Sequence, residues 1–320
     1  MPLWRRTVLR VVGSLATLFA VSVAFFALIE VAPGDYAAAI SGPQTSDADR
    51  NAIRVTLGLD QPLIGRYLSW CRNALQGDLG VSWWTGEPIA DFIWEPVWQT
   101  LWLALLAGLV AVPLGLLLGV TALAWRRTPL DPALGSLTLA AASMPDFLIA
   151  YGLMALLGVH FQWFPVHTFY LDEMSLAARL EASALPVAAL TAMVLTPVYR
   201  ATRAALANEL GSEYVEMARL KGLGEFRILV VHMLPNALAP VANTLVQVAG
   251  QLLLGLVVIE TVFSFPGFGS LLVRAVEFRD VPLLLATSLI CASAYIALVL
   301  TADLLSYWAN PRLRQPLPGV

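Results

Sequence analysis

Residues 97–125 read VWQTLWLALLAGLVAVPLGLLLGVTALAW, a stretch of 29 residues without a charged side chain. A helix needs about 20 mainly apolar residues to cross the hydrocarbon core of a bilayer, which is about 30 Å thick. The stretch is long enough to do so, and Arg126 and Arg127 follow it directly. It predicts an all-α membrane protein.

The composition of the whole chain supports the same class. Hydrophobic residues make up 58% of the 320 residues and charged residues 13%, and the mean hydropathy is +0.74. An average soluble protein is roughly 25% charged. The net charge of −3 excludes a nucleic-acid-binding protein, which needs a basic surface. The single lysine, Lys221, follows a leucine, so the Gly-Lys pair of a Walker A loop is absent. We therefore expect that this chain does not hydrolyse ATP itself.

Further apolar stretches lie on both sides of residues 97–125, and together they predict six transmembrane helices. One stretch, 133–158, is interrupted only by Asp146. Another, 228–259, is too long for one span, so we assign its start to a loop that ends at Pro235. The remaining predicted spans are 11–29, 182–199 and 281–302.

The arginines predict the orientation of these spans. With the N-terminus inside, the short inside segments hold twelve Lys and Arg residues, whereas the much longer outside segments hold seven. Cations concentrate in short cytoplasmic segments, so both termini are expected in the cytoplasm. The expected division is given by residues 1–30 (cytoplasmic start and first span), 31–96 (extracytoplasmic loop), 97–305 (five-helix core with a cytoplasmic loop at 207–237) and 306–320 (cytoplasmic tail).

The long outer loop contains signals for two short helices. Ser46 is a candidate N-cap for a helix that Gly58 ends, and Pro62 begins a second helix that runs to Gly77. The second helix mixes apolar side chains with Arg66. This region either caps the helix bundle or binds an external partner.

The loop between the fourth and fifth spans contains a short, self-capped helix. Ser212 is a candidate N-cap, and Glu213 and Glu216 lie in the first turns, where the helix dipole favours anions. Lys221 lies in the last turn, and Gly222 supplies a left-handed end. Such a helix either lies on the membrane surface as a connector or binds a soluble partner.

The same loop resembles the EAA signature of ABC importer membrane subunits. That signature has Glu-Ala-Ala, three residues, Gly, nine residues, Ile, one residue and Leu-Pro. Here Glu216, Met217 and Ala218 precede Gly222 at that spacing, and Leu234-Pro235 closes the pattern. Met217 replaces the first Ala and His232 replaces the Ile. Both replacements are typical of the dipeptide/oligopeptide/nickel-type permeases.

Other segments resemble the same branch from end to end, in order and with a matching six-span profile. They are APGD (32–35), LGLDQP (57–62), GDLGVS (77–82), ETVFSFPGFG (260–269) and ANPRLR (309–314).

The resemblance implies the permease fold of ABC importers, with a cytoplasmic coupling helix, in a bacterial inner membrane. It implies that this chain forms half of a translocation pathway and that a second homologous permease forms the other half. The further partners that it implies are two ABC ATPase subunits and an extracytoplasmic solute-binding protein. No cofactor, metal or catalytic residue is implied. Dipeptides, oligopeptides, nickel chelates, opines and saccharides all remain possible cargoes. The residues expected to couple to the ATPase are Glu213, Tyr214, Glu216, Met217, Ala218, Lys221 and Gly222.

Three carboxylates lie in or at the ends of the predicted spans, where a charge is costly and often functional. Asp146 follows Pro145 near the middle of the third span, and the proline predicts a kink that frees backbone groups at this point. It either lines the translocation pathway, facing a substrate amine, or is a structural carboxylate bonded to Ser143 or a neighbouring helix. Glu260 and Asp303 lie near span ends and are expected to serve helix packing, capping or a subunit interface.

Two other functions compete with the permease. An ion-coupled secondary transporter would use the membrane carboxylates as proton relays, but no inverted repeat is visible. An intramembrane enzyme would need a motif such as HExxH or G-x-S-x-G, and neither occurs. His160 and His167 lie seven residues apart in an outer loop without a cysteine cluster, so we interpret them as surface residues rather than metal ligands.

Overall fold

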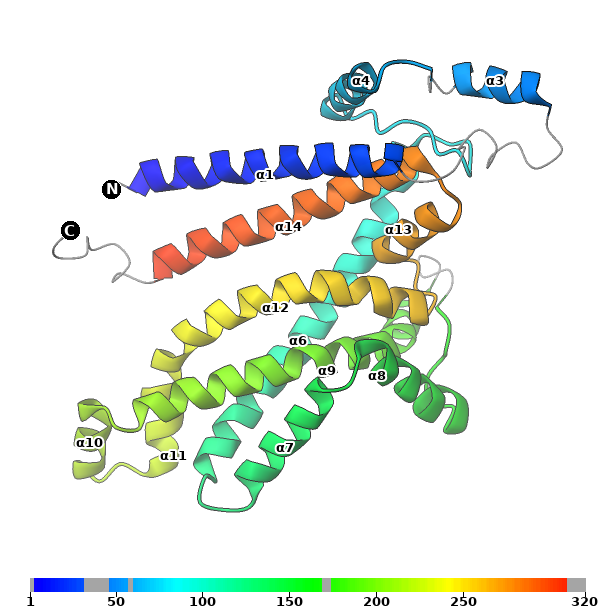
Figure 1. Ribbon diagram of the computed structural model, residues 1–320. Coiled ribbons are helices and arrows are strands. Elements are labelled where there is room, and N and C mark those ends of the chain that lie inside the picture. Colours follow the sequence, from blue (N-terminus) through cyan, green and yellow to red (C-terminus); the bar gives the residue numbers. More distant parts are fainter. Residues whose placement is uncertain (1–2, 32–45, 57–59, 169–173, 310–320) are drawn as a thin grey trace. The chain divides into compact units, whose positions relative to one another are not determined.

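The computed structural model describes residues 3–31, 46–56, 60–168 and 174–309 (Figure 1). These residues are mostly helical, and their β structure is limited to one isolated bridge between Val81 and Pro88. The chain divides into two compact units. The first contains residues 99–266 and the chain from 297 onward, and the second contains residues 2–98 and 267–296.

The first unit is built around two long helices that pack on each other, α9 and α12. Helices α7 and α8 pack on α9, and α8 also packs on α12. Helix α6 (Trp94–Ala124) belongs to this unit from Gln99 onward. The other elements of the unit are α7 (Leu130–Ala142), α8 (Asp146–Leu153), the π-helical η1 (Met154–His160), α9 (Leu176–Glu209), α10 (Glu213–Leu220), α11 (Glu225–Arg227), the π-helical η3 (Ile228–Met233) and α12 (Leu234–Val262).

Five helical segments of the described chain are long and apolar enough to cross a membrane, or six if one bent pair counts as a single span. That pair is α7 with α8–η1, and the two parts meet at an angle of 100°. The third span predicted over 133–158 corresponds to this bent pair, and the predicted number of six spans includes it as one span. Pro145 cannot donate its backbone nitrogen and disfavours helical backbone at Met144, so the helix ends at Ala142 and restarts at Asp146.

Two glycines one helical turn apart allow α6 to approach α9 closely. A Cβ atom added at Gly115 would lie 2.7 Å from Val198 Cγ1, and one added at Gly119 would lie 2.6 Å from Thr202 Cβ. Small residues spaced by four let backbones of membrane helices come into contact. The segment Gly-Leu-Leu-Leu-Gly is therefore the α6 side of the α6–α9 contact.

The core of the first unit also encloses a carboxylate. Glu260 is fully buried near the end of α12 and accepts a hydrogen bond from the Thr100 hydroxyl of α6. Its backbone oxygen accepts from Phe265 N at 2.8 Å, and Phe265 is buried in one hydrophobic cluster with Phe263 and Leu103. Glu260 thus joins α12 to α6 inside the helix bundle.

The second unit contains the N-terminal helix and the short helices of the outer loop. Its elements are α1 (Leu3–Val31), α3 (Asp47–Thr56), α4 (Leu63–Leu75), α5 (Ile89–Phe92), α13 (Phe268–Glu277) and the first part of α14 (Val281–Ala309). The two helices predicted in the outer loop are confirmed. Ser46 Oγ accepts from Asp49 N at the start of α3, and Pro62 precedes α4. The predicted end of the first helix at Gly58 lies outside the described residues.

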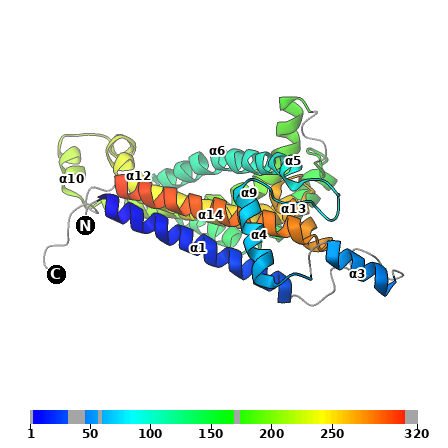
Figure 2. The same ribbon diagram turned by 90° about the horizontal axis from the view of Figure 1, so that it is seen from above.

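One buried aspartate ties the outer loop to the start of α14. Asp280 is fully buried and accepts hydrogen bonds from Ser82 Oγ, Trp84 N and Leu283 N. Phe26 of α1 packs with Val281 and Leu285 of α14 in the same unit, where the two helices lie side by side (Figure 2). Sequence reasoning missed Asp280, because its partners at 82 and 84 are nearly 200 residues away in the chain.

Candidate functional site

The helix predicted in the loop after the fourth span is present as α10. Ser212 precedes it with extended backbone, at the predicted N-cap position. Its hydroxyl, however, donates to Glu209 O at 2.7 Å instead of accepting from the first turn of α10. In place of a side-chain cap, Glu213 and Glu216 stabilise the first turn, because their negative charges interact favourably with the positive end of the helix dipole.

The end of α10 follows the predicted pattern closely. Gly222 has a φ of +74°, in the left-handed region where a side chain is disfavoured. Its N–H donates to Arg219 O at 2.8 Å, and Leu223 N donates to Ala218 O at 3.2 Å. This pair of bonds is a Schellman motif, which satisfies the last carbonyls of the helix and turns the chain toward α11.

One face of α10 is buried and the other is open. Val215 and Ala218 are buried, in a cluster with Leu206 of α9 and with Ile228 and Leu229 of η3. The open face carries apolar side chains as well as charged ones: the exposed fractions are 54% for Met217 and 77% for Leu220, and Glu216 and Lys221 are also exposed. Helix α10 extends beyond the end of α9 (Figure 1).

Polar bonds hold α10 to the elements on either side of it. Tyr214 Oη donates to the Glu209 carboxylate of α9 at 2.7 Å. Arg219 donates from Nε and Nη2 to the two oxygens of Glu225 in α11, at 2.8 and 3.3 Å, and this carboxylate raises the pKa of the guanidinium. These bonds connect α10 to α9 and to the segment that leads into α12.

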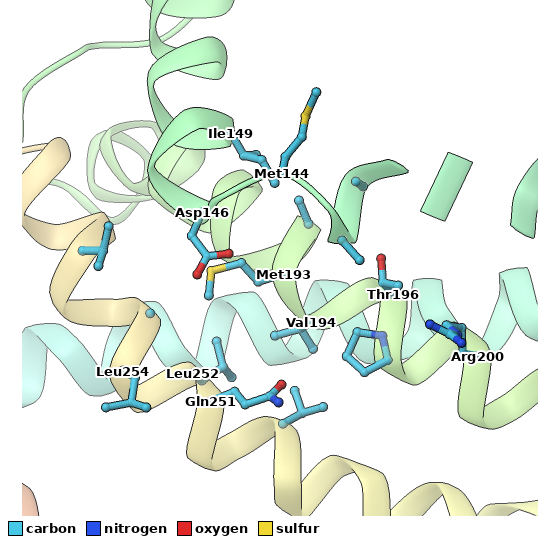
Figure 3. A pocket seen from close by; sticks show the side chains of 17 residues that line it. Met144, Asp146, Ile149, Met193, Val194, Thr196, Arg200, Gln251, Leu252 and Leu254 are labelled. Carbon is cyan, nitrogen blue, oxygen red and sulfur yellow. The ribbon is translucent and has the colours of Figure 1, made fainter. Parts of the chain in front are cut away.

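A cavity of about 600 Å³ opens between α8, α9 and α12. Asp146 enters it from the first turn of α8, directly after the 100° bend, and is half-buried. Figure 3 shows the Asp146 carboxylate beside the Met193 side chain, with Gln251 of α12 among the other lining residues. Arg200 also lines the cavity, seven residues after Met193 and so about 10 Å further along α9.

Asp146 does not form the hydrogen bond with Ser143 that the structural alternative in the sequence analysis named. The Ser143 hydroxyl donates to Leu139 O at 2.8 Å, within α7. Among the residues that the structure describes, none donates a hydrogen bond to the Asp146 carboxylate or forms an ion pair with it. The carboxylate thus faces the cavity with its hydrogen-bonding capacity unused by the described chain.

An ion pair that the sequence analysis did not identify joins α7 to α9. Arg203 Nε and Nη2 donate to Asp131 Oδ1 and Oδ2, each at 2.6 Å, in a bidentate geometry. The signal available in the sequence was weak: both residues lie near span ends on the side assigned to the cytoplasm. Their separation of 72 residues gave no reason to pair them.

The other candidate polar residues lie elsewhere. His160 ends η1 and His167 lies in the following loop. No cluster of three or more metal-ligating side chains occurs in the described part of the chain. Asp303 lies in α14, and its side chain is outside the described residues.

Comparison with known proteins agrees with this arrangement of spans and loop helix. Two family models match: the binding-protein-dependent transport system inner membrane component over residues 111–315, and the N-terminal component of the same systems over residues 3–104. The fold these residues form is that of a multi-pass membrane permease. The chain belongs to the binding-protein-dependent transport system inner membrane component family, and it is a permease subunit of an ABC importer.

Relatives match over nearly their whole length. The glutathione transport system permease protein GsiC of Escherichia coli O6:H1 is 35% identical over 305 residues, covering 95% of this chain and 97% of GsiC. GsiC of Shigella flexneri serotype 5b is 34% identical with the same coverage. A solved structure of the MetNI methionine ABC transporter in an inward-facing conformation matches with a TM-score of 0.50 and 16% identity, covering 69% of this chain and 96% of that one.

Family membership has three direct consequences. The protein is a multi-pass inner membrane protein, and it works with ATPase and binding-protein partners. Members are permease components that are not themselves ATPases. The alternative of an ion-coupled secondary transporter is not supported.

Proposed function

We propose that this chain forms one half of the pathway of a peptide importer, with a second homologous permease supplying the other half. Two ABC ATPase subunits and an extracytoplasmic solute-binding protein complete the assembly. Both termini lie in the cytoplasm, as does α10. The observation that carries the proposal is α10 itself, a helix with a buried anchoring face and an open face of mixed character at the end of a long membrane helix.

The seven residues expected to couple to the ATPase then have two roles. Glu213, Tyr214, Glu216, Met217 and Lys221 present exposed side chains to the ATPase surface. Ala218 is buried against the cluster below α10, so it holds the helix in place rather than touching the partner. Gly222 sets the direction in which the chain leaves the helix.

The cargo we propose is a small peptide or a related solute with a free amine. The relatives named above are glutathione permeases, and the cavity carries one carboxylate, Asp146, with no described partner. An ammonium group that passes the cavity would supply that partner. Arg200 lines the cavity further along α9, and its guanidinium group could bind a carboxylate of the same solute.

Replacing Asp146 with asparagine is expected to lower uptake of peptides with a free amine by about tenfold, because a charge-assisted hydrogen bond contributes about 1.5–3 kcal/mol. Uptake of the same peptides with an acetylated amine should change little. The measurement is uptake of both forms into proteoliposomes that contain the complete transporter.

The matched control is Glu181→Gln, which removes an exposed carboxylate of α9 that does not line the cavity. Its uptake of free-amine peptides should equal that of the wild type. If Asp146→Asn transports both peptide forms at the wild-type rate and affinity, Asp146 is not part of the pathway.

A further inference from the structure

A second cavity of the first unit lies beside the coupling helix, away from the cavity of Asp146. It has a volume of about 670 Å³ and is bordered by the loop after α6 and by the start of the α11–η3 segment. Arg126 and Arg127 line it from the loop, and Arg219 lines it from α10. Glu225 of α11 is the one carboxylate among its lining residues.

The charges of this cavity do not balance. Glu225 is engaged by Arg219 in the bidentate pair described above. Arg126 is held at the cavity by a hydrogen bond from Nη1 to Leu123 O, and Arg127 is exposed. Besides the bidentate pair, which lowers it most, the charges of Arg126 and Arg127 lower the pKa of Glu225, so a single carboxylate faces three guanidinium groups among the lining residues. Guanidinium groups bind phosphate with two parallel hydrogen bonds, so the cavity has the chemistry of a phosphate site.

The cavity lies beside the ends of two helical segments that are long and apolar enough to cross a membrane. The candidate span Ile89–Ala124 ends at its edge, and the helical segment Glu225–Val262 begins there. Two large aromatic side chains on its border are open: Trp125 is 57% exposed and Phe226 is 70% exposed. Tryptophan side chains at span ends are enriched at the level of lipid headgroups, and the exposed phenylalanine adds apolar surface beside it.

We propose that this cavity binds the phosphate of an anionic phospholipid headgroup, held by Arg126 and Arg127. Trp125 and Phe226 then contact the glycerol and the upper acyl chain, which a free phosphate ion could not use. Because Arg219 and Glu225 form the other side of the cavity and tie α10 to α11, the bound lipid adjoins the coupling helix.

The experiment measures lipid retention by native mass spectrometry on the complete transporter, purified in mild detergent. Phosphatidylglycerol and phosphatidylcholine are offered in equal amounts to the wild type and to the double variant Arg126→Gln/Arg127→Gln. The wild type should retain phosphatidylglycerol in preference. The preference should fall by about fivefold for each arginine removed, since a basic residue near a lipid surface contributes about 1 kcal/mol.

The control is Arg227→Gln, which removes an exposed arginine of α11 that does not line the cavity. It should keep the wild-type preference, and millimolar inorganic phosphate should not displace the lipid. The proposal is overturned if the double variant retains phosphatidylglycerol as the wild type does, or if Arg227→Gln loses as much. Displacement by inorganic phosphate would indicate a site for a free anion. Loss of ATPase subunits from the double variant with unchanged lipid would indicate a protein-binding site.

Discussion

Replacing Gly222 with valine is expected to reduce uptake by about tenfold or more while the assembled transporter continues to hydrolyse ATP. Gly222 holds a φ of +74° at the end of α10, and an ordinary L-residue pays roughly 1–2 kcal/mol there, a β-branched residue more. No atom lies within 4 Å of an added Cβ, so the effect comes from the backbone and not from crowding. The chain would leave α10 in another direction, and movement of the ATPase would no longer reach α12.

The loop supplies a matched control for this variant. Gly211 lies just before α10, also has open space around an added Cβ, and does not have a positive φ. Gly211→Val should therefore transport nearly as the wild type does. Gly222→Asn should lie between the two, since asparagine tolerates the left-handed region better than valine. Uptake and ATP hydrolysis are measured on the same proteoliposomes. Normal uptake by Gly222→Val would show that this turn does not transmit the movement.

The second large effect is expected at the contact between α6 and α9. Valine at Gly119 would place its Cβ 2.6 Å from Thr202 Cβ and 3.2 Å from the backbone nitrogen of Arg203, so the two helices must separate. Overpacking of this kind costs about 1–3 kcal/mol. Separation would also strain the Arg203–Asp131 ion pair, which adjoins the contact. We expect a clear loss of folded, detergent-stable protein.

Gly108→Val is the control for this prediction. Gly108 lies on the same helix, and no atom is within 4 Å of an added Cβ. Both variants introduce the same side chain into α6, so the change in helix propensity from glycine to valine is shared. Thermal stability in mild detergent should fall for Gly119→Val and change much less for Gly108→Val. Equal stability of the two would mean that the close approach of α6 and α9 does not stabilise the protein.

Features that depend on short stretches of chain were predictable from the sequence. The charge-free run at 97–125 is long enough to span a bilayer, and the structure has a helix there from Trp94 to Ala124. Pro62 and Gly222 mark a helix start and a helix end because each restricts or frees the backbone at its own position. The EAA spacing located α10 because its residues lie within twenty positions of one another.

Features that depend on packing were not predictable in the same way. Pro145 indicated a kink, but the 100° angle depends on how α7 and α8 pack on α9. The ion pair of Asp131 with Arg203 and the bonds of Asp280 with Ser82 join residues that are distant in the chain. The Ser212 hydroxyl donates to Glu209 O at 2.7 Å and does not cap the first turn of α10, because the end of α9 provides an acceptor.

The central claim is that the open face of α10 binds an ATPase subunit. A photoreactive amino acid placed at Met217, which is 54% exposed on that face, tests it directly in native membranes. Met144 is a control of the same residue type and similar exposure, 57%, that lies at the bend before α8. Mass spectrometry of the cross-linked products should identify an ABC ATPase from position 217 and none from position 144. Products from position 217 that contain only lipid, or proteins without an ATPase domain, would contradict the account.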